Sequence, residues 1–202
     1  MAKYFFHFFI GAMVIVLIGA CESKALSPKQ YLHWIATHKD QLTVSSSKDG
    51  EILHSITYIP AGWLAIKEAG EKQPRQIADA LMEYNGLEYY RLRLALRSGQ
   101  GDILQYAAAN TDEYYARVSY FSFDMQNDVS MLIGKDTFPC RLFHFERNYG
   151  AAPYLDFMLG FDPPETGNVD RTLIYYDPVY SNTPVTMIMA GENITRIPKL
   201  KL

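Results

Sequence analysis

Cysteine is scarce in this chain, with only Cys21 and Cys140, and long apolar runs are equally rare. After residue 20 no stretch approaches the ~20 apolar residues that a transmembrane helix needs. Positive charge is not concentrated either, because 19 Lys and Arg residues face 22 Asp and Glu residues and form no basic stripe. Nucleic-acid binding requires such a concentration, so the sequence argues against a nucleic-acid partner.

Recognisable catalytic and metal-binding motifs are also missing from the sequence. It contains no G-x-S-x-G, H-E-x-x-H, phosphate loop or dinucleotide fingerprint. His33, His38 and His54 form no ligand pattern. We therefore expect no cofactor, no bound metal and no mainstream hydrolase or nucleotide chemistry.

The N-terminus carries the most informative pattern. Lys3 precedes an apolar stretch from Tyr4 to Ile18, which is short for a membrane span and ends in small residues, as secretory signals do. Its last residues, Leu17-Ile18-Gly19-Ala20-Cys21, resemble the lipobox of a bacterial lipoprotein. The resemblance implies that the Cys21 thiol receives a diacylglyceryl group and that the chain is cut before Cys21. An ordinary secretory signal with a chance cysteine, or an uncleaved signal anchor, is the alternative.

This interpretation divides the chain into three parts. We expect a signal peptide over residues 1–20, the lipidated cysteine and a tether over 21–27, and a single β-rich globular domain over 28–202. Glu22 is not the aspartate that commonly retains such proteins at the inner membrane, which favours the outer membrane with the domain facing the periplasm, surface exposure being the alternative. Once Cys21 is acylated, Cys140 has no partner for an intrachain disulfide, so stability must come from packing.

The first half of the domain predicts two helices and three strands. Ser27-Pro28 begins a helix to about Lys39, and a second helix runs from Pro74 to a left-handed cap at Asn85-Gly86. Asp49-Gly50 predicts a tight hairpin turn between strands at 42–44 and 52–58, ended by Pro60 and Gly62. Alternating apolar residues predict a strand over 87–97 with its basic face outward.

The second half of the domain predicts successive strands separated by turn residues. They are expected near 117–123, 129–133, 140–147, 155–161, 172–176 and 185–189. The predicted fold class is α+β and predominantly antiparallel β: a sheet or sandwich of about 8–10 strands with two or three short helices.

Cys140, His144 and Glu146 invite a nucleophile or metal hypothesis. On one strand Cys140 and His144 would lie about 13 Å apart at ~3.3 Å per residue, too far for a thiol–imidazole pair. A buried, inert cysteine is the better interpretation. His144 and Glu146 could share a metal, and the acidic loop 162–170 could offer oxygens to calcium, but neither pattern is specific, and we assign no metal ligands.

Aromatic residues are in excess and often adjacent, as in Tyr89-Tyr90, Tyr114-Tyr115 and Tyr175-Tyr176. Most should fill the core. Because neighbours on a strand point to opposite faces, some rings should be exposed, and Trp63, Tyr89, Tyr114 and Tyr175 are the candidates for a ligand or partner surface.

Four passages of the domain, Tyr120 to Asp128, Pro139 to Arg147, Tyr149 to Tyr154 and Ile197 to Leu202, resemble small uncharacterised lipoproteins of the Bacteroidetes type. The resemblance implies no activity and no functional residue. We predict a lipid-anchored, non-enzymatic envelope protein that acts as an accessory or assembly factor through contacts with an envelope protein. The alternative is a carbohydrate- or peptide-binding lipoprotein that uses exposed aromatics. A third hypothesis is an enzyme built from Cys140 or His144 with residues of distant strands.

Overall fold

The computed structural model describes residues 25–46 and 50–202, so the expected signal peptide, Cys21 and most of the tether lie outside it. The described residues form nine strands and five α-helices. The strands are β1 (Thr43–Ser45), β2 (Ile52–Ile59), β3 (Glu88–Leu96), β4 (Val129–Ile133), β5 (Asp136–Pro139), β6 (Leu142–Glu146), β7 (Tyr154–Phe161), β8 (Arg171–Asp177) and β9 (Thr183–Met189). The α-helices are α1 (Pro28–Thr37), α2 (Ala61–Ala69), α3 (Pro74–Tyr84), α4 (Thr111–Ser119) and α5 (Gly191–Thr195).

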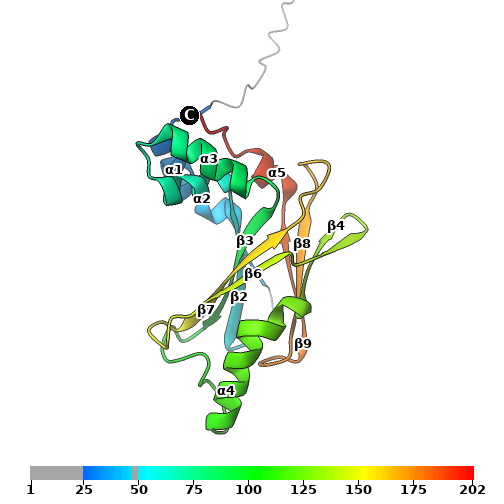
Figure 1. Cartoon of the computed structure of the whole chain (residues 1–202). Coiled ribbons are helices and arrows are strands. Elements are labelled where there is room, and N and C mark those ends of the chain that lie inside the picture. The colour runs from blue at the N-terminus through cyan, green and yellow to red at the C-terminus, as the bar shows by residue number, and fades with distance from the viewer. Residues whose placement is uncertain (1–24, 47–49) are drawn as a thin grey trace, which may run out of the picture.

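The strands form two antiparallel sheets, which confirms the expected α+β, mainly antiparallel fold. One sheet has the order β1-β2-β3-β7-β6 and the other the order β5-β4-β8-β9. Figure 1 shows the two sheets as facing layers, with α4 crossing the lower part of the molecule. Within residues 25–46 and 50–202, no helix is long and apolar enough to cross a membrane.

One hydrophobic core fills the space between the sheets, because alternate residues of each strand point inward. On β3 the inward residues are Tyr90, Leu92, Leu94 and Leu96, all of them buried. The neighbouring strand β7 of the same sheet supplies Phe157, and β8 and β9 of the facing sheet supply Leu173 and Met187, among others. Each fully buried apolar side chain contributes about 1.5–3 kcal/mol, so this interlayer core holds the two sheets together.

The two ends of this sandwich differ. Leu26 forms a parallel bridge with Leu200, so both ends of the described domain lie beside α1, α2 and α3, as Figure 1 shows. We call this the helical end. β2 runs toward it and β3 runs away from it, so Ile52 and Leu96, which pair with each other, lie at the opposite end. This far end carries α4 and the loops at 97–110, 147–153 and 178–182.

The predicted strand at 117–123 is wrong, because α4 and a π-helical turn, η2 (Tyr120–Asp124), occupy this segment. The Asn110 side chain accepts a hydrogen bond from the Glu113 N–H at 2.9 Å, which caps the helix. Arg117 then pairs with Glu113 one turn earlier. The alternating aromatics that predicted a strand instead place Phe121 inward and Phe123 outward on a helical turn.

Helix α2 was not expected, because Gly62 was interpreted as a strand terminator. Gly62 is instead buried in the helix, where a Cβ would lie 3.2 Å from the Tyr31 ring. The hairpin between β1 and β2 exists, with Ser45 paired to Ser55. The predicted turn at Asp49-Gly50 includes Asp49, which lies outside the described residues. Asn85 has φ −86°, so the expected left-handed cap of α3 is absent at that residue.

Candidate functional site

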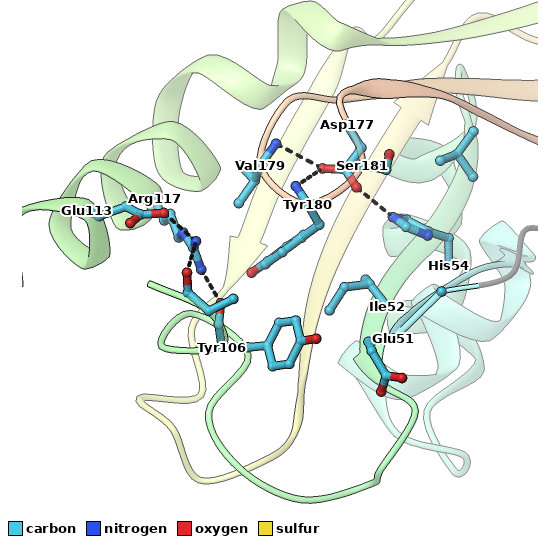
Figure 2. Close-up of a pocket in the computed structure, with 13 residues that line it drawn as sticks. Glu51, Ile52, His54, Tyr106, Glu113, Arg117, Asp177, Val179, Tyr180 and Ser181 are labelled. Atoms are coloured by element: carbon cyan, nitrogen blue, oxygen red, sulfur yellow. Dashed lines mark hydrogen bonds and ion pairs between the residues drawn. The ribbon is translucent and has the colours of Figure 1, made fainter. Parts of the chain in front are cut away.

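A cavity of about 370 Å³ opens at the far end of the sandwich. Its walls come from the start of β2, the end of β8, α4 and the loop that precedes α4. Figure 2 shows His54 and Asp177 on one side and Arg117 and Glu113 on the other, with Tyr106 and Tyr180 between them. Segments far apart in the sequence therefore contribute to one polar and aromatic hollow, which we call the far-end cavity.

His54 and Asp177 form the buried side of the cavity. Each lies on the inward face of its strand, His54 between Ile52 and Ile56 on β2 and Asp177 at the end of β8. His54 is 4% exposed and Asp177 is fully buried. The His54 Nε2 and Asp177 Oδ2 atoms are 3.4 Å apart, an ion-pair contact that lacks hydrogen-bond geometry. Both atoms, like the Tyr175 hydroxyl behind them, have no hydrogen-bond partner among the described residues.

The other carboxylate oxygen of Asp177 organises the turn after β8. Its Oδ1 accepts hydrogen bonds from the N–H groups of Val179 at 3.1 Å and Tyr180 at 3.0 Å. Burial by itself would raise the pKa of Asp177, but the His54 contact and these two N–H donors outweigh it and hold that pKa below its ordinary value. Asp177 is therefore a carboxylate at neutral pH, although it is buried.

Arg117 fixes the opposite wall. Its guanidinium donates to the backbone oxygens of Leu104 at 3.2 Å and Tyr106 at 2.6 Å, and to Glu113 Oε1 at 2.5 Å. The segment it holds includes Ala107, which has a positive φ of 55°. A side chain that satisfies several backbone carbonyls holds a loop in place, so Arg117 has a positioning role here.

Two tyrosines face the hollow between these walls. The Tyr180 hydroxyl donates to the Ile103 oxygen at 2.8 Å, and its ring stacks on Phe121 with centroids 6.2 Å apart. The Arg117 guanidinium carbon lies 5.3 Å from the centroid of the same ring. Tyr106 is 37% exposed, so its ring is open to solvent at the mouth. The cavity thus combines the exposed ring of Tyr106, the fixed ring of Tyr180 and buried polar atoms, as binding sites for small polar molecules do.

The chain matches no protein-family model, no curated protein and no solved structure.

The four aromatics expected on a surface are dispersed over the fold. Tyr89 is 6% exposed and Tyr175 is fully buried, so the expectation of exposed rings is wrong for these two residues, whose strands are covered on the faces they occupy. Tyr114 is half-buried on α4, against Tyr115. Trp63 is half-buried on α2, under the Lys67 ammonium at 5.6 Å. It lines a separate groove of about 220 Å³ at the helical end.

Cys140 is a buried thiol and lies outside the far-end cavity. Burial raises the pKa of this thiol to about 11, so it is protonated at neutral pH and a poor nucleophile. Its Sγ–H donates to the Leu142 oxygen at 3.0 Å. His144 and Glu146 are exposed on β6. Among residues 25–46 and 50–202, no group of three or more His, Cys, Asp or Glu side chains is arranged to hold a metal ion.

The residues that line the cavity were not predicted from the sequence, although two of them left a signal there. On β2, His54 lies between Ile52 and Ile56 on the face that is otherwise apolar. On β8, Asp177 lies on the same face as Leu173 and Tyr175. A polar residue on the inward face of a strand must be buried, and buried polar groups usually have a partner or a function. Arg117 and Tyr106 left no such signal, because the helix and loop that hold them were not expected.

We expect Asp177 to make stability depend on pH in the acid range. Its pKa is lowered on folding, so its stabilising effect is present above the unfolded value of about 3.9 and is lost as pH falls through the folded value. Between about pH 5 and pH 2, the free energy of unfolding should therefore fall more steeply for the wild type than for Asp177→Asn. Urea denaturation at a series of pH values measures both slopes, and equal slopes would contradict the prediction.

Proposed function

We propose that this protein is a lipid-anchored envelope protein that binds a small polar ligand, a saccharide or a short peptide, in the far-end cavity. The sequence supports the anchor through the lipobox at Cys21. The observation that carries the binding role is an open cavity whose wall holds two buried polar atoms, His54 Nε2 and Asp177 Oδ2, which are in ion-pair contact at 3.4 Å but form no hydrogen bond. A buried polar atom without a hydrogen bond costs about 1–3 kcal/mol, and a ligand that rearranges this wall on binding can offset the cost by supplying hydrogen bonds.

The concave shape also favours this function over a flat protein-contact surface. Tyr106, which is 37% exposed, offers an open ring on which a sugar or peptide group can pack. The domain would present this opening away from the membrane, because the chain enters at Leu26, at the helical end. Binding rather than turnover is consistent with the protonated, buried state of Cys140.

A panel of saccharides and short peptides tests the proposal, with binding to the purified full chain measured by calorimetry. We expect Tyr106→Ala to weaken binding of any hit by about tenfold, because it removes an open ring from the cavity. Tyr149→Ala is the matched control, because Tyr149 is 82% exposed and does not line the cavity. Equal losses in both variants, or no binding to any member of the panel, would contradict the proposal.

A second candidate function, the accessory or assembly factor, is favoured by one observation. Tyr115 and Phe123, on α4 and η2, are 64% and 75% exposed, and large exposed rings are enriched where proteins bind each other. A photoreactive phenylalanine analogue placed at either position should cross-link an envelope protein in intact cells. Met82 on α3, 69% exposed at the helical end, is the control position. Cross-links from Met82 alone would argue against this surface.

The anchor has its own test. Cys21→Ser should abolish labelling by a fatty-acid analogue, because the Cys21 thiol is the only acceptor in the lipobox. Unchanged labelling together with unchanged membrane retention would show that the lipobox interpretation is wrong.

A further inference from the structure

We infer that the helical end binds a lipid of the fatty-acid type, which is a single apolar chain with a carboxylate head. The site is the groove of about 220 Å³ beside Trp63, which we call the helical-end groove. This groove is separate from the far-end cavity, so the inference goes beyond the proposed ligand-binding function. The choice of a lipid as the ligand rests on the proposed anchor.

The helical-end groove lies on the outer face of β2 and β3, between α1 and α2, and its surface is largely apolar. Ile59 of β2 is 7% exposed, and Leu42, at the end of the short helix η1 (Lys39–Leu42), is 1% exposed. Ile35 of α1 and the half-buried Trp63 of α2 also line the groove. An apolar hollow with an indole ring at its side fits a hydrocarbon chain better than a sugar.

Two cations without a counter-charge line the same groove. Lys39 of η1 and Arg91 of β3 come from separate elements, and the described residues that line the groove include no Asp or Glu. Neither cation forms an ion pair or a side-chain hydrogen bond within residues 25–46 and 50–202. Arg91 is half-buried, so its charge is partly removed from water without compensation. A groove that carries only positive charge attracts anions.

The next arginine on this face of β3 shows how the sheet compensates a guanidinium elsewhere. Arg93 donates to both carboxylate oxygens of Asp156, at 2.7 and 2.6 Å, and lies 3.7 Å from the centroid of the Tyr154 ring. Arg91 has no such acid or ring among the described residues. A guanidinium binds a carboxylate through two parallel N–H donors, so a carboxylate ligand would give Arg91 what Asp156 gives Arg93.

The position of the groove favours a lipid over other carboxylates. Ile35 and Trp63 pack in the same hydrophobic cluster as Leu26, where the chain enters the domain. Leu26 follows Cys21 by five residues, which reach at most about 18 Å. With Cys21 acylated, the helical end would therefore lie beside the bilayer, where fatty-acid chains are concentrated.

Octanoate and octylammonium test the inference, because they carry chains of equal length and opposite charge. We expect octanoate to bind the full chain about tenfold more tightly than octylammonium, in non-ionic detergent at neutral pH. Arg91→Gln should reduce this preference severalfold and keep the wild-type melting temperature, because Arg91 has no ion pair to lose among the described residues. Lys135→Gln, at an exposed turn between β4 and β5, is the matched control and should keep the preference. Equal binding of the two ions, or no binding of octanoate, would overturn the inference.

Two further variants locate the bound octanoate. Trp34→Phe leaves Trp63 as the single tryptophan, and octanoate should change its fluorescence. Tyr106→Ala, in the far-end cavity, should leave octanoate binding unchanged. Loss of binding in Tyr106→Ala but not in Arg91→Gln would show that octanoate occupies the far-end cavity, which would overturn the inference.

A third probe, N-acetyl-leucine, carries the carboxylate and the apolar side chain of a peptide C-terminus. We expect it to bind more weakly than octanoate, because its apolar part is shorter and buries less surface. Tighter binding of N-acetyl-leucine would identify a peptide as the ligand and overturn the inference. These results leave the proposed function to its own tests, since the saccharide and peptide panel reports on the far-end cavity and fatty-acid labelling reports on the anchor.

Discussion

Replacing Arg171 with methionine should lower the free energy of unfolding by about 3–5 kcal/mol, the usual cost of breaking a buried ion pair from one side. Arg171 is 1% exposed and joins the two sheets at the helical end, where it donates to Glu88 through Nε at 3.1 Å and through an Nη at 2.5 Å. It also donates to the Gly167 oxygen at 2.7 Å. The substitution leaves Glu88 charged between the layers without its cation.

Urea denaturation of the wild type and Arg171→Met measures this loss. Arg196→Met is the matched control, because Arg196 pairs with Glu192 on the surface, where an ion pair contributes little. The double variant Glu88→Leu/Arg171→Met should recover part of the loss, since it removes the stranded carboxylate as well. Similar stabilities of Arg171→Met and Arg196→Met would contradict the prediction.

Replacing Phe121 with alanine should lower the free energy of unfolding by about 3–5 kcal/mol, the range for removing a large ring from a packed core. Phe121 is fully buried and contacts Phe157, Phe145 and Tyr180, with ring centroids 5.6, 6.3 and 6.2 Å away. It attaches the α4–η2 segment to the core and supports a wall of the far-end cavity. Ligand binding should therefore weaken together with stability.

Phe123→Ala is the control, because Phe123 lies on the same turn and is 75% exposed. We expect its stability to stay within about 0.5 kcal/mol of the wild type, as for most surface substitutions. Thermal or urea unfolding of the two variants separates a buried from an exposed ring of the same segment. A larger effect of Phe123→Ala than of Phe121→Ala would show that the segment faces the other way.

Sequence periodicity predicted the strands well where alternate residues point into the core, as they do on β4, β8 and β9. β4 was expected at the residues it occupies, and the strands expected over 87–97, 155–161 and 172–176 correspond to β3, β7 and β8. The α4–η2 segment was mispredicted because Tyr120, Phe121 and Phe123 have high strand propensity, while the Asn110 cap and the Glu113–Arg117 pair act over a helical turn. Tertiary contacts decided the outcome.

The candidate site could be predicted less well, because it depends on which strands face each other. His54 and Asp177 lie in different sheets, and no local pattern says that β2 and β8 oppose one another at this end. The expected aromatic surface failed at Tyr175 for the same reason, since its strand lies in the middle of a sheet with its inner face covered. The sequence pattern alone showed only that His54 and Asp177, two polar residues, occupy inward-facing positions of their strands.

The bridge between Leu26 and the C-terminal segment determines how the domain responds to mechanical load. The Leu26 N–H donates to the Lys199 oxygen and the Lys201 N–H donates to the Leu26 oxygen, both at 2.8 Å. A pull applied through the N-terminus reaches these two hydrogen bonds before it reaches either sheet. Drag on the domain would therefore detach the C-terminal segment and α1 first, while the sandwich and its far-end cavity keep their shape.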